Sequence, residues 1–197
     1  MQAEDCRQLC ALANDLPSLL LTVAPESVTQ TQITELSNSG AIVSLGHTDT
    51  DYQTACEVAV SGATCVTHLF NAMSQLGNRE PGVVGATLDT KKLFAGLIAD
   101  GIHVNPATIR VAIRAKQGAG RLFLVTDAMA PLGTDMKEFT LDGRRILRRD
   151  GRLTLSDGTL AGADLDMISA VRFMVNEINL DIDEALRMAS LYPAQLL

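Results

Sequence analysis

The sequence predicts an α/β fold built around a parallel β-sheet, and three observations support this class. Short apolar runs alternate with amphipathic stretches along much of the chain. Within the runs, apolar and polar positions alternate only weakly, which is typical of strands buried on both faces of a parallel sheet. Successive runs begin about 20 to 30 residues apart, which is the spacing of βα units.

The five predicted strands are rich in apolar and β-branched residues, and each is followed closely by polar residues. Helices are predicted between them because amphipathic segments there have start and stop signals, such as Asn105 before Pro106 and Gly62 after residues 51–61. Five strands alone fit either an open doubly wound sheet or part of a barrel. The predicted strands span residues 19–24, 41–46, 64–67, 94–99 and 121–126, and the predicted helices between them span 27–39, 51–61 and 106–116.

The pattern changes after Asp127. Short β-like runs at 139–141, 145–148 and 153–155 are separated by Asp-Gly pairs, which are strong hairpin signals. Two more amphipathic segments, 164–176 and 181–190, follow as predicted helices. The sequence therefore predicts a small β-hairpin insertion after the last parallel strand.

Composition limits the classes of partner. The chain has 197 residues and 47% hydrophobic residues, which predicts a single globular domain over residues 1–197. Its net charge of −7 argues against nucleic acid as a partner, since phosphate binding needs a clustered basic surface. One basic cluster lies in the hairpin segment, and we interpret it as a solvated face. Its members are Arg144, Arg145, Arg148 and Arg149.

Cysteine usage and hydropathy suggest a cytoplasmic protein. Cys6, Cys10, Cys56 and Cys65 form no CxxC pair, which favours free, reduced thiols. The N-terminus lacks the order of charges and apolar residues of a signal peptide, and no apolar run is long enough to span a membrane. We therefore expect no membrane partner.

All three histidines follow predicted strands. His47 follows the second strand, His68 the third and His103 the fourth. The carboxyl ends of strands form the active site in barrels and in open α/β sheets. We therefore predict that His47 and His68 are two ligands of one divalent metal ion, because imidazoles on neighbouring strands can converge. The alternative is that each histidine is only hydrogen-bonded at a sheet edge.

Two carboxylates and one arginine are further candidates. Asp127 ends a fully apolar strand and could accept and return a proton beside a metal site, or could simply cap a turn. Glu26 is a possible ligand by type and position. Arg79 lies in the segment REPGVVG, where glycines allow the backbone to approach a ligand and the guanidinium suits phosphate. A surface loop is an equally good interpretation of that segment.

These segments resemble the N-acetylglucosamine-6-phosphate deacetylases of the amidohydrolase superfamily. The most specific motifs are THLFNAM, REPG, ADGIHV and VTDAMAP, which occur in the order found in that family. The matching segments extend over nearly the whole chain. They are LTVAPE (21–26), LGHTDTDY (45–52), VTHLFNAM (66–73), NREPGVVGA (78–86), IADGIHV (98–104), LVTDAMAP (124–131), DGTLAGADLDM (157–167) and LRMASLYPA (186–194).

The resemblance implies hydrolysis of N-acetylglucosamine 6-phosphate to glucosamine 6-phosphate and acetate, a step of amino-sugar catabolism, with a metal-bound water as nucleophile. It implies Zn²⁺ or Fe²⁺ at His47 and His68 and an acid/base role for Asp127. His103 is implied to polarise the acetamide carbonyl or to hold the sugar. Further implied substrate contacts are Asn71, Ala72, Arg79, Leu160, Ala161 and Gly162, with Arg79 in some relatives acting across a homodimer interface.

The chain departs from this family in two ways. The family's metal-binding glutamate lies in an HLEGP-type segment that this sequence lacks, and the resemblance implies that Glu26 caps or supports the strand end instead. The family barrel has eight strands, of which this chain matches the last five, and the family's β-sandwich domain is also missing. The sequence therefore predicts a partial (β/α)8 barrel with weak or absent activity.

Three alternative functions remain open at this point. The chain could be another amidohydrolase that acts on a cyclic amide or a nucleobase, although the REPG and THLFNAM segments favour a phosphosugar. It could also be a non-catalytic fragment that retains only sugar-phosphate binding or dimer contacts. An open α/β sheet with no site would leave the positions of the histidines and Asp127 to chance.

Overall fold

The computed structural model describes residues 1–197 and contains two β-sheets. The first is a five-stranded parallel sheet in which the strand order follows the chain without any reversal. This confirms the predicted α/β class and the positions of all five parallel strands. They are β1 (Leu20–Val23), β2 (Ile42–Leu45), β3 (Ala63–Val66), β4 (Phe94–Ile98) and β5 (Leu122–Val125).

The register of the parallel strands brings their carboxyl ends to one edge of the sheet. Leu45, the last residue of β2, pairs with Val23 of β1 and with Val66 of β3. Ile98 of β4 pairs with Val125 of β5 in the same way. The residues that follow the strands therefore emerge side by side, at the edge where α/β proteins bind their ligands.

Helices connect the strands, and most begin at a side-chain cap. Thr29, Asp51 and Asn105 each accept a hydrogen bond from a backbone N–H of the first turn. The cap of the second connecting helix is Asp51, at the first residue of the predicted helical segment 51–61. The helices are α1 (Ala3–Asp15), α2 (Gln30–Asn38), α3 (Tyr52–Ser61), α4 (Gly82–Asp89), α5 (Pro106–Ala115), α6 (Met167–Asn176), α7 (Ile182–Ala189) and α8 (Leu191–Leu196).

Helix α4 begins within the segment REPGVVG, so the surface-loop interpretation is wrong for this segment from Gly82 onward. It is almost entirely buried, and its glycines permit close packing. A β-carbon on Gly85 would lie 2.3 Å from Cβ of Pro81, so no other residue fits there without displacement. The loop before α4 is held by Glu80, whose carboxylate accepts hydrogen bonds from the N–H groups of Tyr52 and Gly82. No helix of the chain is long and apolar enough to cross a membrane.

One hydrophobic core joins the strands to the helices. Helix α2 buries Ile33 and Leu36 completely, and each contributes about 2 kcal/mol of hydrophobic stabilisation. Strand β1 is the exception, because Leu20 is 42% exposed and no strand pairs with the outer edge of β1. The prediction that every strand is buried on both faces is therefore wrong for β1.

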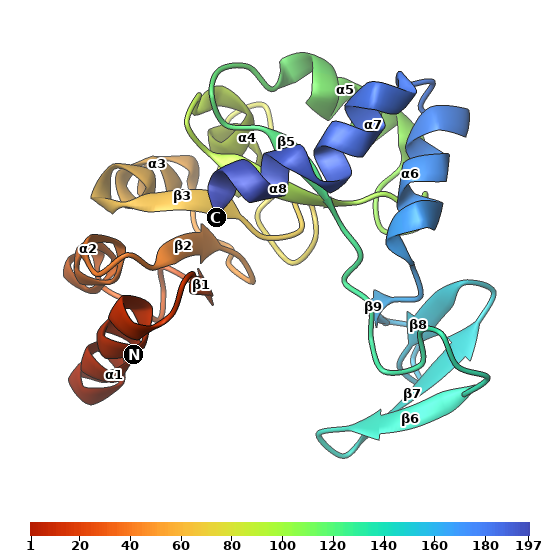
Figure 1. Cartoon of the computed structure of the whole chain (residues 1–197), viewed down its shortest axis with the longest axis horizontal. Coiled ribbons are helices and arrows are strands. Elements are labelled where there is room, and N and C mark those ends of the chain that lie inside the picture. Colours follow the sequence, from red (N-terminus) through yellow and green to blue (C-terminus); the bar gives the residue numbers. More distant parts are fainter.

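The second sheet has four antiparallel strands and lies apart from the parallel sheet in Figure 1. The two predicted turns have positive φ at both central residues, which are Asp-Gly in each case, as two-residue hairpins require. The fourth strand was not predicted from the sequence, which gave residues 160–162 only as implied substrate contacts. The strands are β6 (Glu138–Leu141), β7 (Arg144–Arg149), β8 (Arg152–Thr154) and β9 (Leu160–Ala163).

The arginines of the second sheet are not all solvated. Arg148 donates from Nε to the Asp164 carboxylate at 2.7 Å and from Nη1 to the carbonyl oxygen of Pro131 at 3.1 Å. Its side chain is only 21% exposed. Arg148 thus ties the sheet to the segments on either side of it, and the expectation of a solvated basic face is wrong for this residue.

All four cysteines are free thiols, as the sequence predicts. Burial is the main cause that raises the pKa of the Cys65 thiol in β3 to about 11. Such a thiol stays protonated near neutral pH and is a poor nucleophile.

Candidate active site

His47 and His68 meet at the carboxyl edge of the parallel sheet. The Nε2 atoms of the two rings are 2.9 Å apart, and the ring planes meet at 71°. Both residues have positive φ, 52° and 32°, a region that is costly for residues with side chains and that concentrates at functional sites. The expected meeting of the two rings is therefore present, while their role as metal ligands stays a prediction.

Gly46 allows the backbone to turn directly before His47. A β-carbon there would lie 2.9 Å from Cγ2 of Thr22 and 2.9 Å from Cβ of Thr67. The hydroxyl of Thr67 also forms hydrogen bonds with those of Thr22 and Ser44, at 2.8 and 2.7 Å. The packing of β1, β2 and β3 thus leaves no room for a side chain at position 46.

His68 is buried and held in its neutral form. Burial is the largest cause that lowers its pKa, the charge of Asp127 opposes this shift, and His47 adds to it. The Nδ1 atom of His68 is buried without a hydrogen-bond partner. Neutral imidazole is the form that binds a metal ion, so the electrostatics fit a ligand at this position.

The chain has no metal site built from three protein ligands. The chain contains no group of three or more histidine, cysteine, aspartate or glutamate side chains placed to hold one ion. Two imidazole nitrogens converge, which fits part of the first coordination sphere of Zn²⁺ or a similar ion. A further protein ligand would have to come from outside these residues.

Glu26 supports the loop after β2. Its carboxylate accepts a hydrogen bond from the Thr48 hydroxyl, with both carboxylate oxygens 2.7 Å from Oγ1, and another from the Asp49 N–H at 3.1 Å. Burial alone would raise the pKa of Glu26, but these hydrogen bonds outweigh it and lower the pKa. This geometry agrees with a supporting role rather than with metal binding.

Asp127 follows β5 and lines the same cavity as His68. This cavity of about 250 Å³ lies on one face of the parallel sheet and is also lined by Gly96 of β4. The φ of Asp127 is 50°, and its carbonyl oxygen accepts a hydrogen bond from the N–H of Ala163 at 2.8 Å. The structure thus places a carboxylate close enough to His68 to perturb its titration.

His103 forms a buried pair with Asp100. Nδ1 of His103 is 2.6 Å from Oδ2 of Asp100, and the two side chains are 6% and 7% exposed. Oδ1 of Asp100 also accepts the N–H groups of Ile102 and His103, both at 2.8 Å. Since a carboxylate only accepts, Nδ1 of His103 carries the proton. Sequence reasoning gave Asp100 no role, although its position three residues before a strand-end histidine was a usable signal.

Asn71 and Ala72 lie beside the histidine pair, whereas Arg79 does not contact it. Nδ2 of Asn71 donates to the carbonyl oxygens of His68 and Leu69, at 3.4 and 3.3 Å. The carbonyl oxygen of Ala72 accepts the N–H of Thr48 at 3.1 Å, which joins the loops after β2 and β3. Arg79 is exposed and forms no hydrogen bond or ion pair.

The second sheet covers one side of the histidine pair. A cavity of about 370 Å³ lies between His47 and this sheet, and Leu160 and Ala161 of β9 line it. Gly162 has a φ of 87°, and a β-carbon there would lie 2.5 Å from Sδ of Met129. Two of the expected substrate contacts, Leu160 and Ala161, therefore line a cavity beside His47, and Gly162 follows them in the same strand.

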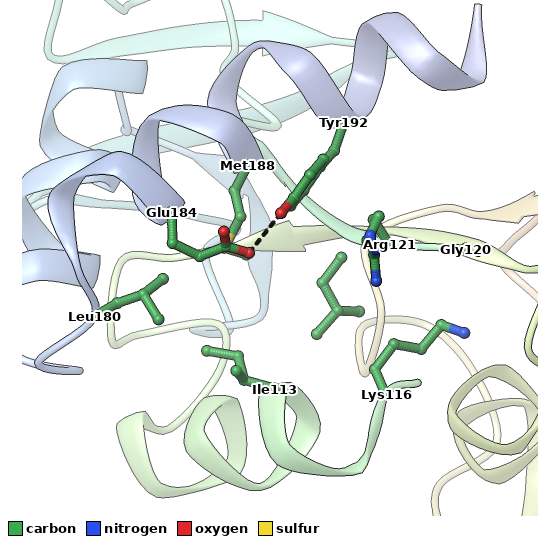
Figure 2. A pocket seen from close by; sticks show the side chains of 9 residues that line it. Ile113, Lys116, Gly120, Arg121, Leu180, Glu184, Met188 and Tyr192 are labelled. Atoms are coloured by element: carbon green, nitrogen blue, oxygen red, sulfur yellow. Dashed lines mark hydrogen bonds between the residues drawn. The ribbon is translucent and has the colours of Figure 1, made fainter. Parts of the chain in front are cut away.

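A third cavity, shown in Figure 2, is not a good candidate for this chemistry. It has a volume of about 90 Å³ and lies beside Arg121, at the amino end of β5, away from the histidines. Its charged groups already have partners: Glu184 accepts the Tyr192 hydroxyl at 2.7 Å, and Lys116 donates to the carbonyl oxygen of Thr90 at 2.9 Å. Amino ends of barrel strands serve stability rather than catalysis.

Comparisons with known proteins identify the family of the chain. The amidohydrolase family matches residues 21–197. The N-acetylgalactosamine-6-phosphate deacetylase of Shewanella sp. strain ANA-3 is 46% identical over 96% of this chain and 48% of that enzyme. The N-acetylglucosamine-6-phosphate deacetylase of Haemophilus influenzae is 36% identical over 89% of this chain and 46% of that enzyme.

Solved structures show the same relationship. The crystal structure of N-acetylglucosamine-6-phosphate deacetylase from Pasteurella multocida has a TM-score of 0.93 and 38% identity, and the match covers 100% of this chain and 51% of that one. A mutant of the Mycobacterium smegmatis enzyme in complex with N-acetyl-D-glucosamine-6-phosphate has a TM-score of 0.88 and 33% identity. That match covers 98% of this chain and 52% of the mutant's chain. The chain thus spans about half the length of these relatives. By both sequence and structure, it belongs to the amidohydrolase family.

Proposed function

We propose that this chain carries part of the active site of an amino-sugar 6-phosphate deacetylase. The reaction is hydrolysis of N-acetylglucosamine 6-phosphate to glucosamine 6-phosphate and acetate. The observation that carries the proposal is the 2.9 Å contact between Nε2 of His47 and Nε2 of His68 at the carboxyl ends of adjacent strands. The names of the relatives supply the substrate class.

The parallel sheet is proposed to be five strands of a (β/α)8 barrel, within a single domain over residues 1–197. Its support is the strand order, which follows the chain. A doubly wound sheet would contain a reversal of order at its switch point. Right-handed crossovers in one direction place the connecting helices on one face and leave the other face as the barrel interior.

His47 and His68 would hold a divalent metal ion, which amidohydrolases generally use. When bound there, Zn²⁺ or Fe²⁺ would supply a Lewis acid that lowers the pKa of a coordinated water and polarises the acetamide carbonyl. Asp127 would take a proton from the attacking water and give it to the departing amine nitrogen. Its place beside His68 supports this role.

His103 is proposed to bind the sugar. Asp100 holds the proton of His103 on Nδ1, so the neutral ring presents an acceptor at Nε2, which suits a sugar hydroxyl. To donate a hydrogen bond from Nε2 to the acetamide carbonyl oxygen, the His103 ring would have to be in its imidazolium form. The loops of Asn71 and Ala72, and residues Leu160, Ala161 and Gly162, would enclose the substrate, and Arg79 would act at its phosphate.

A second candidate substrate is N-acetylgalactosamine 6-phosphate, the substrate named for the Shewanella enzyme at 46% identity. The two sugars differ only in the configuration at C4. Acetate release from both 6-phosphates and from the unphosphorylated N-acetylglucosamine would distinguish the substrates. A chain that uses the unphosphorylated sugar equally well, or that hydrolyses cyclic amides instead, would contradict the proposal.

The proposed function also differs from that of a non-catalytic binding module in a measurable way. A deacetylase site takes up a divalent ion at the histidine pair, and a binding module does not need one. Metal analysis of the purified chain, together with calorimetry using glucosamine 6-phosphate, separates the two functions. Sugar-phosphate binding without any metal uptake would favour the binding module.

A further inference from the structure

We infer that Ser74 is a positioning residue, which holds the loop that carries Arg79 so that the guanidinium reaches the phosphate of the substrate. This inference rests on the proposed function, in which Arg79 acts at that phosphate, and adds a residue that neither the motifs nor the comparisons assign. Ser74 directly follows the segment THLFNAM, and α4 begins at Gly82. The Arg79 loop, which consists of residues 75–81, therefore begins at Ser74 and ends at α4.

The Ser74 hydroxyl forms hydrogen bonds to two other segments. Oγ donates to the carbonyl oxygen of Thr50, in the loop after β2, at 2.6 Å, and accepts the N–H of Val83, in the first turn of α4, at 2.8 Å. The main chain of Ser74 adds two more bonds. Its N–H donates to the carbonyl oxygen of Thr48 at 3.2 Å, and its carbonyl oxygen accepts the N–H of Val84 at 3.3 Å. Ser74 thus joins the loops after β2 and β3 to the start of α4.

Helix α4 depends on these acceptors because it has no side-chain cap of its own. Its N-cap residue is Pro81, and the N–H groups in the first turn of a helix need acceptors from outside the helix. The Ser74 hydroxyl serves Val83, and a carboxylate oxygen of Glu80 serves Gly82 at 2.9 Å. Val83 is completely buried, so its N–H would be left unsatisfied if the hydroxyl were removed.

The base of the Arg79 loop is packed closely. Gly82 has a φ of 61°, and a β-carbon there would lie 2.8 Å from Oγ and 2.8 Å from the carbonyl oxygen of Ser74. Within the loop, the N–H of Gly77 donates to the carbonyl oxygen of Glu80 at 3.0 Å. The Arg79 side chain is exposed and forms no ion pair of its own, so the loop alone determines where the guanidinium lies.

Removal of the Ser74 hydroxyl should shift the Arg79 loop more than the histidine pair. In the loop after β2, Thr48 keeps its hydrogen bonds to Glu26 and to the carbonyl oxygen of Ala72. The N–H of Val83 has no other acceptor. An arginine binds a phosphate through two parallel hydrogen bonds that require a defined geometry, so a displaced guanidinium loses affinity for the phosphate.

Calorimetric titration of the whole, metal-free 197-residue chain with glucosamine 6-phosphate and with glucosamine tests the inference without relying on catalysis. We expect Ser74→Ala to weaken binding of glucosamine 6-phosphate about threefold to tenfold, the effect of losing about one hydrogen bond, and to leave binding of glucosamine unchanged. Ser74→Thr keeps the hydroxyl and should bind as the wild type does. Ser39→Ala is the matched control, since Ser39 is a half-buried serine at the end of α2 whose hydroxyl donates to the carbonyl oxygen of Leu36 at 2.8 Å.

A double-mutant cycle with Arg79→Gln tests whether Ser74 acts through Arg79. In the Arg79→Gln background, Ser74→Ala should cause no further loss of affinity for glucosamine 6-phosphate, because the guanidinium that Ser74 positions is absent. A merely structural role, including partial unfolding, would reduce binding by the same factor in both backgrounds and would overturn the inference.

The outcomes separate this inference from the proposed function. If Arg79→Gln removes the preference for glucosamine 6-phosphate but Ser74→Ala keeps it, the inference is wrong and the proposed function stands. Equal losses in Ser74→Ala and Ser74→Thr would show that the hydroxyl is not responsible, which also overturns the inference. A wild-type chain without any preference for the phosphorylated sugar, or an Arg79→Gln chain that binds it as well as the wild type does, would contradict both the inference and the proposed phosphate contact.

Discussion

Glu26 ties the end of β1 to the loop that begins with His47, through a 2.7 Å hydrogen bond from the Thr48 hydroxyl. We therefore predict that Glu26 supports the metal site without binding the ion. Glu26→Gln and Thr48→Val should each weaken Zn²⁺ binding by about 10-fold to 100-fold, the range for residues that orient ligands. His47→Ala should abolish binding. Isothermal titration with Zn²⁺ checks this, and an effect of Glu26→Gln as large as that of His47→Ala would make Glu26 a ligand.

Metal binding should stabilise the fold through the histidine pair. An ion that binds only the folded state adds about 2.7 kcal/mol at a concentration 100 times its Kd. We expect Zn²⁺ to raise the Tm of the wild-type chain and of His103→Asn, but not that of His68→Ala. Differential scanning calorimetry with and without Zn²⁺ measures this. An equal rise in Tm for the wild-type chain and both variants would show that the ion binds at another site.

The stability of the chain should depend on pH through Asp100. Burial would raise its pKa, but the hydrogen bond from His103 and those from the backbone N–H groups outweigh burial and lower the pKa in the folded state. A carboxyl group with a lowered pKa stabilises the fold fully above its unfolded pKa of about 3.9, and this contribution is lost as pH falls through the folded pKa.

Asp100→Asn should therefore destabilise the chain by about 2 kcal/mol at pH 7, the cost of breaking a buried charge-assisted hydrogen bond. The difference from wild type should shrink as pH falls below about 4. Urea unfolding at pH 7, 5 and 3.5 measures both effects. Asp142→Asn, at an exposed turn, is the control and should change little. If the difference in unfolding free energy between wild type and Asp100→Asn is the same at all three pH values, the loss of stability does not come from the charge of Asp100.

Gly46→Ala should destabilise the strand end that carries His47. The added methyl group meets Thr22 and Thr67 at 2.9 Å, and such overpacking costs about 1 to 3 kcal/mol. Adding Thr22→Ser removes one of the two contacts and should restore part of the stability. Chemical denaturation of both variants checks this. A Gly46→Ala chain as stable as wild type would show that the strands can separate freely here.

The chain by itself should deacetylate slowly. It offers two imidazoles to the metal and no third protein ligand, so the affinity for the ion and the activity should both be low. We expect an acetate-release rate at least about 100-fold below that of the Pasteurella multocida relative under the same conditions. A rate equal to that of the relative would contradict this expectation.

Much of the fold could be predicted because apolar runs and caps are local signals. Strand β4 and helix α5, with Asn105 before Pro106, follow directly from such patterns. Helix α4 could not, because Gly82 and Gly85 disfavour helices in isolation, and burial against Pro81 and its surroundings outweighs that preference. Strand β9 was missed because its extended form is stabilised by pairing with β8 and with the segment after β5, which no local pattern encodes.

The candidate site, like the fold, could be predicted from the sequence only in part. The meeting of His47 and His68 follows from parallel neighbouring strands, so spacing was enough to predict it. The hydrogen bond from His103 to Asp100 depends on ring orientation, which spacing does not determine. The cavity that Leu160 shares with His47 depends on how the second sheet packs, and no local pattern encodes that.

The order of the parallel sheet has a consequence for how the chain reaches its fold. Every strand pairs with the strand that directly precedes or follows it in sequence, and the second sheet is built in the same way. Loop closure between such neighbours costs less entropy than closure between strands far apart in sequence, and contacts of shorter sequence separation form faster. Each βα unit can therefore dock onto the previous one as it leaves the ribosome. The histidine pair would be assembled when β3 joins β2, well before Asp127 and the covering sheet have been synthesised.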